Sequence, residues 1–119
     1  MQYVLLIYQG TTPLPGSEAW ETLSDDEHKA IYADYGAINQ TPGVTPGLPL
    51  GLPENATTVR VQDGKALTTE GPYVGMKEAV GGYFIVEADD LDAAIERAVQ
   101  IPAARLGGAI EVRPVATYW

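Results

Sequence analysis

The sequence predicts an α+β domain with a ferredoxin-like βαββαβ order and an extra β-hairpin. Three observations support this prediction: strand-length segments that are apolar throughout, two amphipathic helical patterns with capping signals, and an Asp63-Gly64 turn between alternating segments. The resulting order is strand, helix, hairpin, strand, helix, strand. With 119 residues, the chain has the size of one domain, expected to cover residues 1–119.

The first predicted strand spans residues 3–8 and is apolar on both of its alternating faces. The helices of the same chain can cover one face. In so small a domain, a second subunit is the easiest cover for the other, so a homodimer is expected. Residues 10–16 then break the pattern with glycine and proline and form a loop.

The first helix is predicted to begin after Ser24. Ser24 and Glu27 form a capping-box pattern, and the first turn is strongly acidic, as a helix N-terminus favours. Its apolar stripe is expected to meet the sheet and follows the helical spacing, with His28, Ile31, Tyr32, Tyr35 and Ile38 as members.

A proline- and glycine-rich segment, residues 41–53, is predicted to be a long loop with an edge strand at residues 48–52. The hairpin follows, with strands at residues 56–62 and 65–69 joined by the Asp63-Gly64 turn.

The second half of the chain repeats the strand, helix, strand pattern. Residues 83–87 are apolar on both faces, and residues 109–115 form the last strand, with Pro114 marking its end or a sheet edge. Asp89 or Asp90 caps the second helix, and Pro102 stops it. Its stripe consists of Leu91, Ala94, Ile95, Ala98 and Ile101.

Composition excludes several classes of function. Sixteen acidic residues face seven Lys and Arg, and the net charge of −9 argues against nucleic acids and anionic membranes as partners. No cysteine is present, so a metal site is not expected beside a single histidine, and no cofactor motif occurs. The apolar run at residues 3–8 is too short to span a bilayer, and no signal peptide is recognised, so a cytoplasmic protein is expected.

Several segments together resemble the YCII-related family in its DGPF branch. They are residues 3–8, 68–73, 77–78, 81–87, 89–94, 101–105 and 111–115, which include Glu70-Gly71-Pro72-Tyr73 and Gly81-Gly82-Tyr83-Phe84. The resemblance implies a dimeric α+β barrel, in which two ferredoxin-like sheets pack face to face. It also implies a pocket with a histidine and a carboxylate. The sequence departs from the family's Asp-Gly-Pro-Phe, because Glu70 is longer by one methylene and Tyr73 adds a hydroxyl.

His28 and Glu70 are the candidate catalytic residues. As the only histidine, His28 has a usual pKa that suits proton transfer near neutral pH. The resemblance places the pocket histidine on the first helix, and Glu70 would orient it. The alternatives are a histidine packed near the helix start and a carboxylate exposed to water at a strand end.

The candidate ligand-binding residues are Tyr8, Tyr32, Tyr73, Tyr83 and Arg105. Tyrosines at these places can line a pocket, and they can equally belong to the core or to a dimer interface. Arg105 can bind an anion, cap helix carbonyls, or pair with a carboxylate.

Two functions therefore compete. The first is binding of a small molecule in a pocket at the sheet and first-helix side, with cofactor-free isomerase- or lyase-like catalysis by His28 and Glu70. The second is a non-catalytic dimeric module that binds a ligand or a protein. Because relatives in the DGPF branch are often encoded near sigma factors, this second function suggests a regulatory setting.

Overall fold

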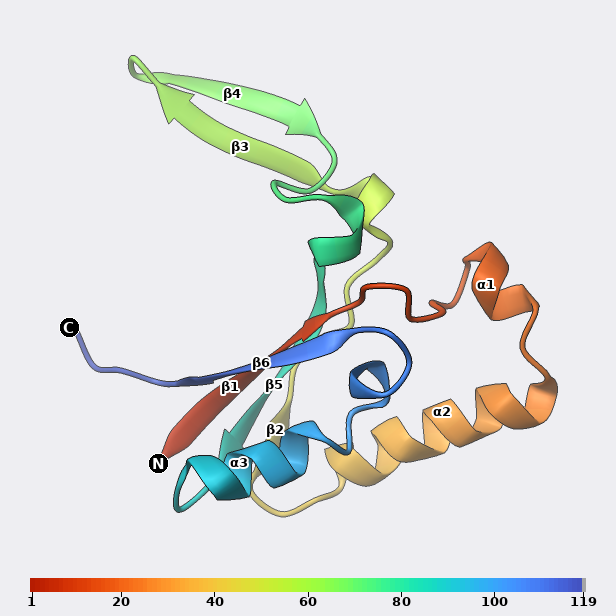
Figure 1. Cartoon of the computed structure of the whole chain (residues 1–119). Helices are drawn as coiled ribbons and strands as arrows, with labels where there is room; N and C mark the ends of the chain where they lie inside the picture. The colour runs from red at the N-terminus through yellow and green to blue at the C-terminus, as the bar shows by residue number, and fades with distance from the viewer. Residues whose placement is uncertain (119) are drawn as a thin grey trace.

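A four-stranded antiparallel sheet forms the centre of the fold (Figure 1). The computed structural model describes residues 1–118, without the side chain of Lys77. The strand order is β2-β5-β1-β6. This arrangement, with two helices between the strands, agrees with the predicted ferredoxin-like α+β fold. The strands are β1 (Gln2–Tyr8), β2 (Val44–Pro46), β5 (Val80–Glu87) and β6 (Ala109–Pro114).

Helices α2 (Asp25–Asn39) and α3 (Leu91–Ala98) pack on one face of this sheet. Both begin where the sequence predicts. The Ser24 hydroxyl accepts a hydrogen bond from the Glu27 amide at 3.1 Å, and the Asp90 carboxylate accepts one from Ala93 at 2.9 Å. The core between the layers includes Tyr3, Leu5, Ile7, Ile38, Phe84, Val86, Ala94, Ala98 and Ile101.

Within residues 1–118, no helix covers the other face of the sheet (Figure 1). Because side chains alternate along a strand, β1 and β5 turn a second apolar set toward this outer face. Within one chain most of these side chains are half-buried and Tyr83 is 37% exposed, whereas the inner set is fully buried. The outer set consists of Val4, Leu6, Tyr8, Tyr83 and Ile85, and β6 adds Glu111 and Arg113 at its side.

The predicted hairpin forms a separate two-stranded sheet that projects away from the rest of the chain (Figure 1). Its strands are β3 (Thr57–Gln62) and β4 (Lys65–Glu70). Positive φ angles of 52° at Asp63 and 75° at Gly64 fit the tight turn that this dipeptide favours. Nearly all of its side chains are exposed. A two-stranded hairpin exposed on both faces has little stability of its own.

The edge strand lies earlier than the sequence analysis placed it. Instead of residues 48–52, the three-residue β2 pairs with β5. Beyond it, only the amides of Gly47 and Leu50 reach β5, at 3.1 and 3.0 Å from the carbonyls of Tyr83 and Gly81. The intervening Pro49 has no N–H to donate, so a regular ladder cannot continue.

Four short helical segments were not predicted. The α-helical turn α1 (Glu18–Glu21) begins at Ser17, whose hydroxyl accepts a hydrogen bond from the Trp20 amide at 3.3 Å. The other three are 3₁₀ turns: η1 (Pro53–Asn55), η2 (Met76–Glu78) and η3 (Pro102–Ala104). The last one follows the point where Pro102 was expected to end the second helix.

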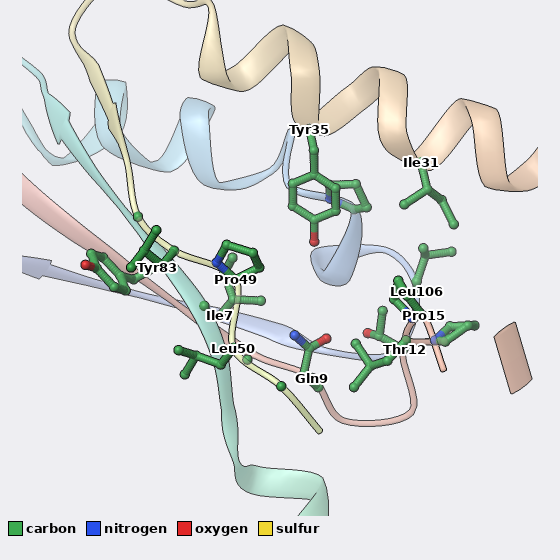
Figure 2. Close-up of a pocket in the computed structure, with 18 of the residues that line it drawn as sticks. Ile7, Gln9, Thr12, Pro15, Ile31, Tyr35, Pro49, Leu50, Tyr83 and Leu106 are labelled. Carbon is green, nitrogen blue, oxygen red and sulfur yellow. The ribbon is translucent and has the colours of Figure 1, made fainter. Parts of the chain in front are cut away.

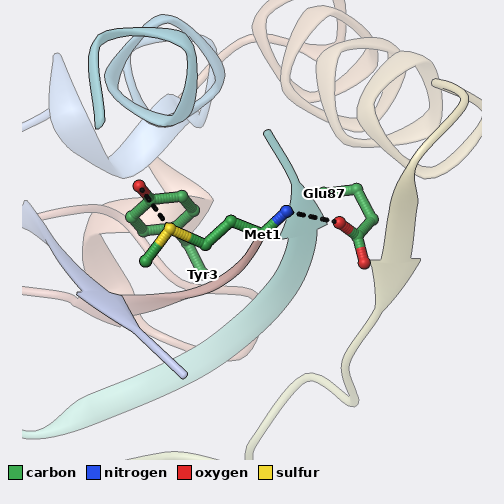
Figure 3. Close-up of polar contacts among 3 residues, drawn as sticks. All are labelled: Met1, Tyr3 and Glu87. Atoms are coloured by element: carbon green, nitrogen blue, oxygen red, sulfur yellow. Dashed lines mark hydrogen bonds and ion pairs between the residues drawn. The ribbon is translucent and has the colours of Figure 1, made fainter. Parts of the chain in front are cut away.

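The N-terminus is fixed beside the end of β5 (Figure 3). The Met1 ammonium group lies 3.2 Å from a Glu87 carboxylate oxygen, and the Ala88 amide donates to the Met1 carbonyl at 2.9 Å. The Tyr3 hydroxyl donates to the Met1 sulfur at 3.5 Å. The ion pair is exposed and contributes little stability by itself.

Candidate ligand-binding cavity

A cavity of about 610 Å³ lies between α2 and the inner face of the sheet (Figure 2). This size falls in the range of small-molecule sites. Its floor comes from the ends of β1 and β5, its roof from α2, and its sides from two proline-rich loops. These elements contribute Ile7, Gly82 and Phe84 from the sheet, Ile31, Tyr32 and Tyr35 from α2, Pro13, Leu14 and Pro15 from the first loop, and Leu48, Pro49 and Leu50 from the second.

The lining of the cavity carries no charged side chain among the described residues. It is mostly aliphatic and aromatic, with a few polar groups. Such a space favours an uncharged molecule, because an ion entering it would lose its hydration without a partner of opposite charge.

Trp20 of α1 forms the far wall of the cavity, where it lies against the start of α2. The His28 ring stacks on Trp20 with 4.1 Å between ring centroids and 4° between planes. The His28 Nε2 atom donates to the Trp20 carbonyl at 2.7 Å. Tyr32 meets the same indole edge-on, at 5.4 Å. His28 therefore fixes α1 against α2, and the lining of the cavity does not include its ring.

Glu70 lies at the end of β4, in the exposed hairpin, whereas His28 lies on the first turn of α2 (Figure 1). Among the described residues, no hydrogen bond or ion pair joins the two side chains within one chain. That the two residues act together stays a prediction.

The predicted ligand-binding residues are spread over three places. Tyr32 lines the cavity. Tyr83 is also among the lining residues, although its place in β5 turns its side chain to the outer face of the sheet, where Tyr8 lies. Tyr73 is 75% exposed and borders a separate hollow of about 330 Å³ at the base of the hairpin. Arg105 forms an ion pair with Asp34 of α2. Of the three roles considered for Arg105, the structure therefore shows pairing with a carboxylate.

Gln9 and Thr12 line the cavity and were not among the candidates. Gln9 continues the inward-facing series of β1, being buried like Tyr3, Leu5 and Ile7. The pairing of β1 with β5 shifts at this point, which leaves Gly81 as an extra residue in β5. The alternation of β1 assigns Gln9 to the inner side, but the bulge that gives its amide room appears only once the strands are paired.

Comparison with known proteins identifies the family. The family model of the YCII-related domain matches residues 1–118. The chain belongs to the YCII-related family. A relative, the uncharacterized protein R00369 of Rhizobium meliloti (strain 1021), is 27% identical over 123 residues, covering 99% of this chain and 94% of that protein.

Within residues 1–118, no three acidic or histidine side chains gather closely enough to hold a metal ion. In the same part of the chain, every helix is too short or too polar to cross a bilayer.

Tyr35 is the lining residue whose ionisation the protein alters. Its ring stacks against Phe84 with centroids 6.4 Å apart. Burial raises the pKa of the Tyr35 phenol above its usual value of 10.0, and the nearby Arg105 charge offsets part of this effect. The hydroxyl facing the cavity is therefore neutral and able to donate a hydrogen bond at physiological pH.

We expect the Tyr35 phenol to ionise above pH 10, at a higher pH than an exposed tyrosine. Because the folded state then binds this proton more tightly than the unfolded state, the contribution of Tyr35 to stability should fall as pH rises above about 10. Subtracting the 295 nm absorbance titration of Tyr35→Phe from that of the wild type isolates this group. A difference curve with its midpoint at or below pH 10 would contradict the expectation.

Proposed function

We propose that this YCII-related protein is a homodimer that binds a neutral, largely apolar small molecule in the cavity beneath α2. The observation that carries the proposal is the uncharged cavity of about 610 Å³, formed by four separate parts of the fold. An apolar concave site with a few convergent polar groups is the usual form of a small-molecule site.

Binding without catalysis is better supported than acid–base chemistry. The ring of the only histidine is stacked on Trp20, and its Nε2 already donates to a backbone carbonyl. A general base must reach the reacting proton directly or through one water. Catalysis by His28 and Glu70 in the dimer stays a hypothesis. It would be supported if His28→Ala lost turnover of an identified substrate.

The outer face of the sheet supports the homodimer. Its centre is apolar, with Val4, Leu6 and Ile85 only half-buried in one chain, and the charged Glu111 and Arg113 lie toward β6. An apolar centre with a charged rim is typical of protein interfaces. A second copy placed face to face would complete the burial of β1. Membership of the DGPF branch, a cytoplasmic location and a sigma-factor-linked role stay predictions.

Binding of the neutral dye Nile red tests the cavity. In Ile31→Trp, the larger ring should fill space under α2 and weaken binding at least tenfold, as measured by the fluorescence of directly excited Nile red. The matched control is Ile95→Trp, because Ile95 lies on α3, partly exposed and outside the cavity lining. Equal binding by the wild type and both variants would show that the dye binds elsewhere, and would count against the cavity as the site.

A further inference from the structure

The cavity has one polar end, where three side chains from different elements point toward the same space. Figure 2 shows the Gln9 amide, the Thr12 hydroxyl and the Tyr35 hydroxyl directed toward one another across the cavity. The remainder of the lining is almost entirely apolar. The polar end of the cavity therefore favours a polar group of a bound molecule, and the apolar remainder favours a hydrocarbon part.

Gln9 is the most informative of the three. The residue is 8% exposed, and among the described residues its Oε1 atom has no hydrogen-bond partner. A buried carbonyl oxygen without a partner costs roughly 1–3 kcal/mol. An amide oxygen that bonds no other group of the protein, held at a cavity wall, is more readily explained by ligand binding than by a role in folding.

Gly81 shows that the fold makes room for this side chain. A Cβ atom at position 81 would lie 1.6 Å from Gln9 Nε2 and 2.4 Å from its Cγ. Only a glycine at the β5 bulge allows the amide to lie flat across the strand. The bulge thus directs the Gln9 amide along the cavity wall.

Thr12 and Tyr35 complete the polar end. The Thr12 Oγ1 atom is buried, and among the described residues it too has no partner. Tyr35 offers a neutral hydroxyl, since burial disfavours its phenolate. A carbonyl oxygen that only accepts therefore faces two hydroxyls that can donate or accept.

We infer that the cavity selects neutral apolar molecules bearing a donor. A hydroxyl group would donate to Gln9 Oε1 and accept from the Tyr35 or Thr12 hydroxyl, and an N–H group would donate to Gln9 Oε1. The inference rests on the proposed function and deepens it by naming the ligand class. Hydrocarbons lacking a donor would leave all three groups unpaired. Anions would be repelled by the partial negative charge of the Gln9 carbonyl oxygen.

Two probes of nearly equal shape test the inference: 2-naphthol, which carries a donor, and 2-methylnaphthalene, which does not. The dissociation constants of both are measured by isothermal titration calorimetry in the wild type and in Gln9→Met. The naphthol-to-methylnaphthalene affinity ratio should fall about five- to tenfold in Gln9→Met, the effect of one lost hydrogen bond. Binding of 2-methylnaphthalene should be retained, which shows that the variant is folded.

Thr12→Val supplies a second variant should Gln9→Met fold poorly, and a smaller fall in the ratio is expected. Tyr8→Phe is the matched control, because it removes a hydroxyl from the outer face of the same strand. An unchanged ratio in both cavity variants would overturn the inference and leave the cavity proposal intact. Failure of both probes to bind the wild type would reject the cavity proposal and this inference together.

Discussion

Arginine in place of Leu6 is expected to leave the protein monomeric at micromolar concentration, where the wild type forms a dimer. Leu6 lies at the middle of the outer sheet face, opposite Tyr83 in β5 and Glu111 in β6. Packing a second sheet over it would bury a guanidinium group, whose desolvation costs several kcal/mol even beside a carboxylate. Since about 1.4 kcal/mol changes a dissociation constant tenfold, the dimer should weaken by two or more orders of magnitude.

The same change should be tolerated within one chain. On an open face the arginine remains in water, and its cross-strand neighbour Glu111 provides an opposite charge. Loss of the dimer would therefore not be a consequence of unfolding, and circular dichroism should be unchanged.

Size-exclusion chromatography with light scattering measures the result directly. Val99→Arg is the matched control, because Val99 follows α3, on the helical side, and is already exposed. We expect the control to stay dimeric. A monomeric wild type would reject the homodimer itself, and a dimeric Leu6→Arg would move the interface to another surface.

Local signals predicted most of the fold because their physical causes are local. The capping box at Ser24 and the turn at Asp63-Gly64 each depend on a few neighbouring residues, and both occur as expected. The alternation of apolar residues in β1 placed its inner set in the core for the same reason.

Predictions that depended on tertiary pairing were less successful. The edge strand was expected at residues 48–52, but the position of β2 depends on which amides can reach β5. The turn α1 is held by a Ser17 cap and by stacking with His28, a contact between residues eight apart that no periodicity indicates. Spacing along a chain does not specify such contacts.

The candidate site illustrates the same limit. His28 was singled out for its chemistry, yet its ring is used to fix Trp20. Gln9 was passed over because it stands at the boundary between strand and loop, although the inward series of β1 extends to it. Whether a polar residue at such a place faces water or a cavity depends on the β5 bulge, which appears only once the strands are paired.

Leu5→Ala should produce a large loss of stability, about 2–5 kcal/mol. Leu5 is 1% exposed and lies in the core between the sheet and the helices. The truncation removes its apolar contacts and leaves a void that a central strand, paired on both sides, cannot close. Against a total of roughly 5–15 kcal/mol for a domain, this loss should be plain in urea unfolding at a fixed protein concentration.

Leu67→Ala removes the same atoms from the projecting hairpin, where Leu67 is 47% exposed. Because its side chain meets few others in one chain, we expect a loss of about 0.5 kcal/mol or less. The contrast between the two leucines separates the packed core from the hairpin. Similar losses at both positions would contradict the exposure of the hairpin, and would mean that the protein in solution buries it against another surface.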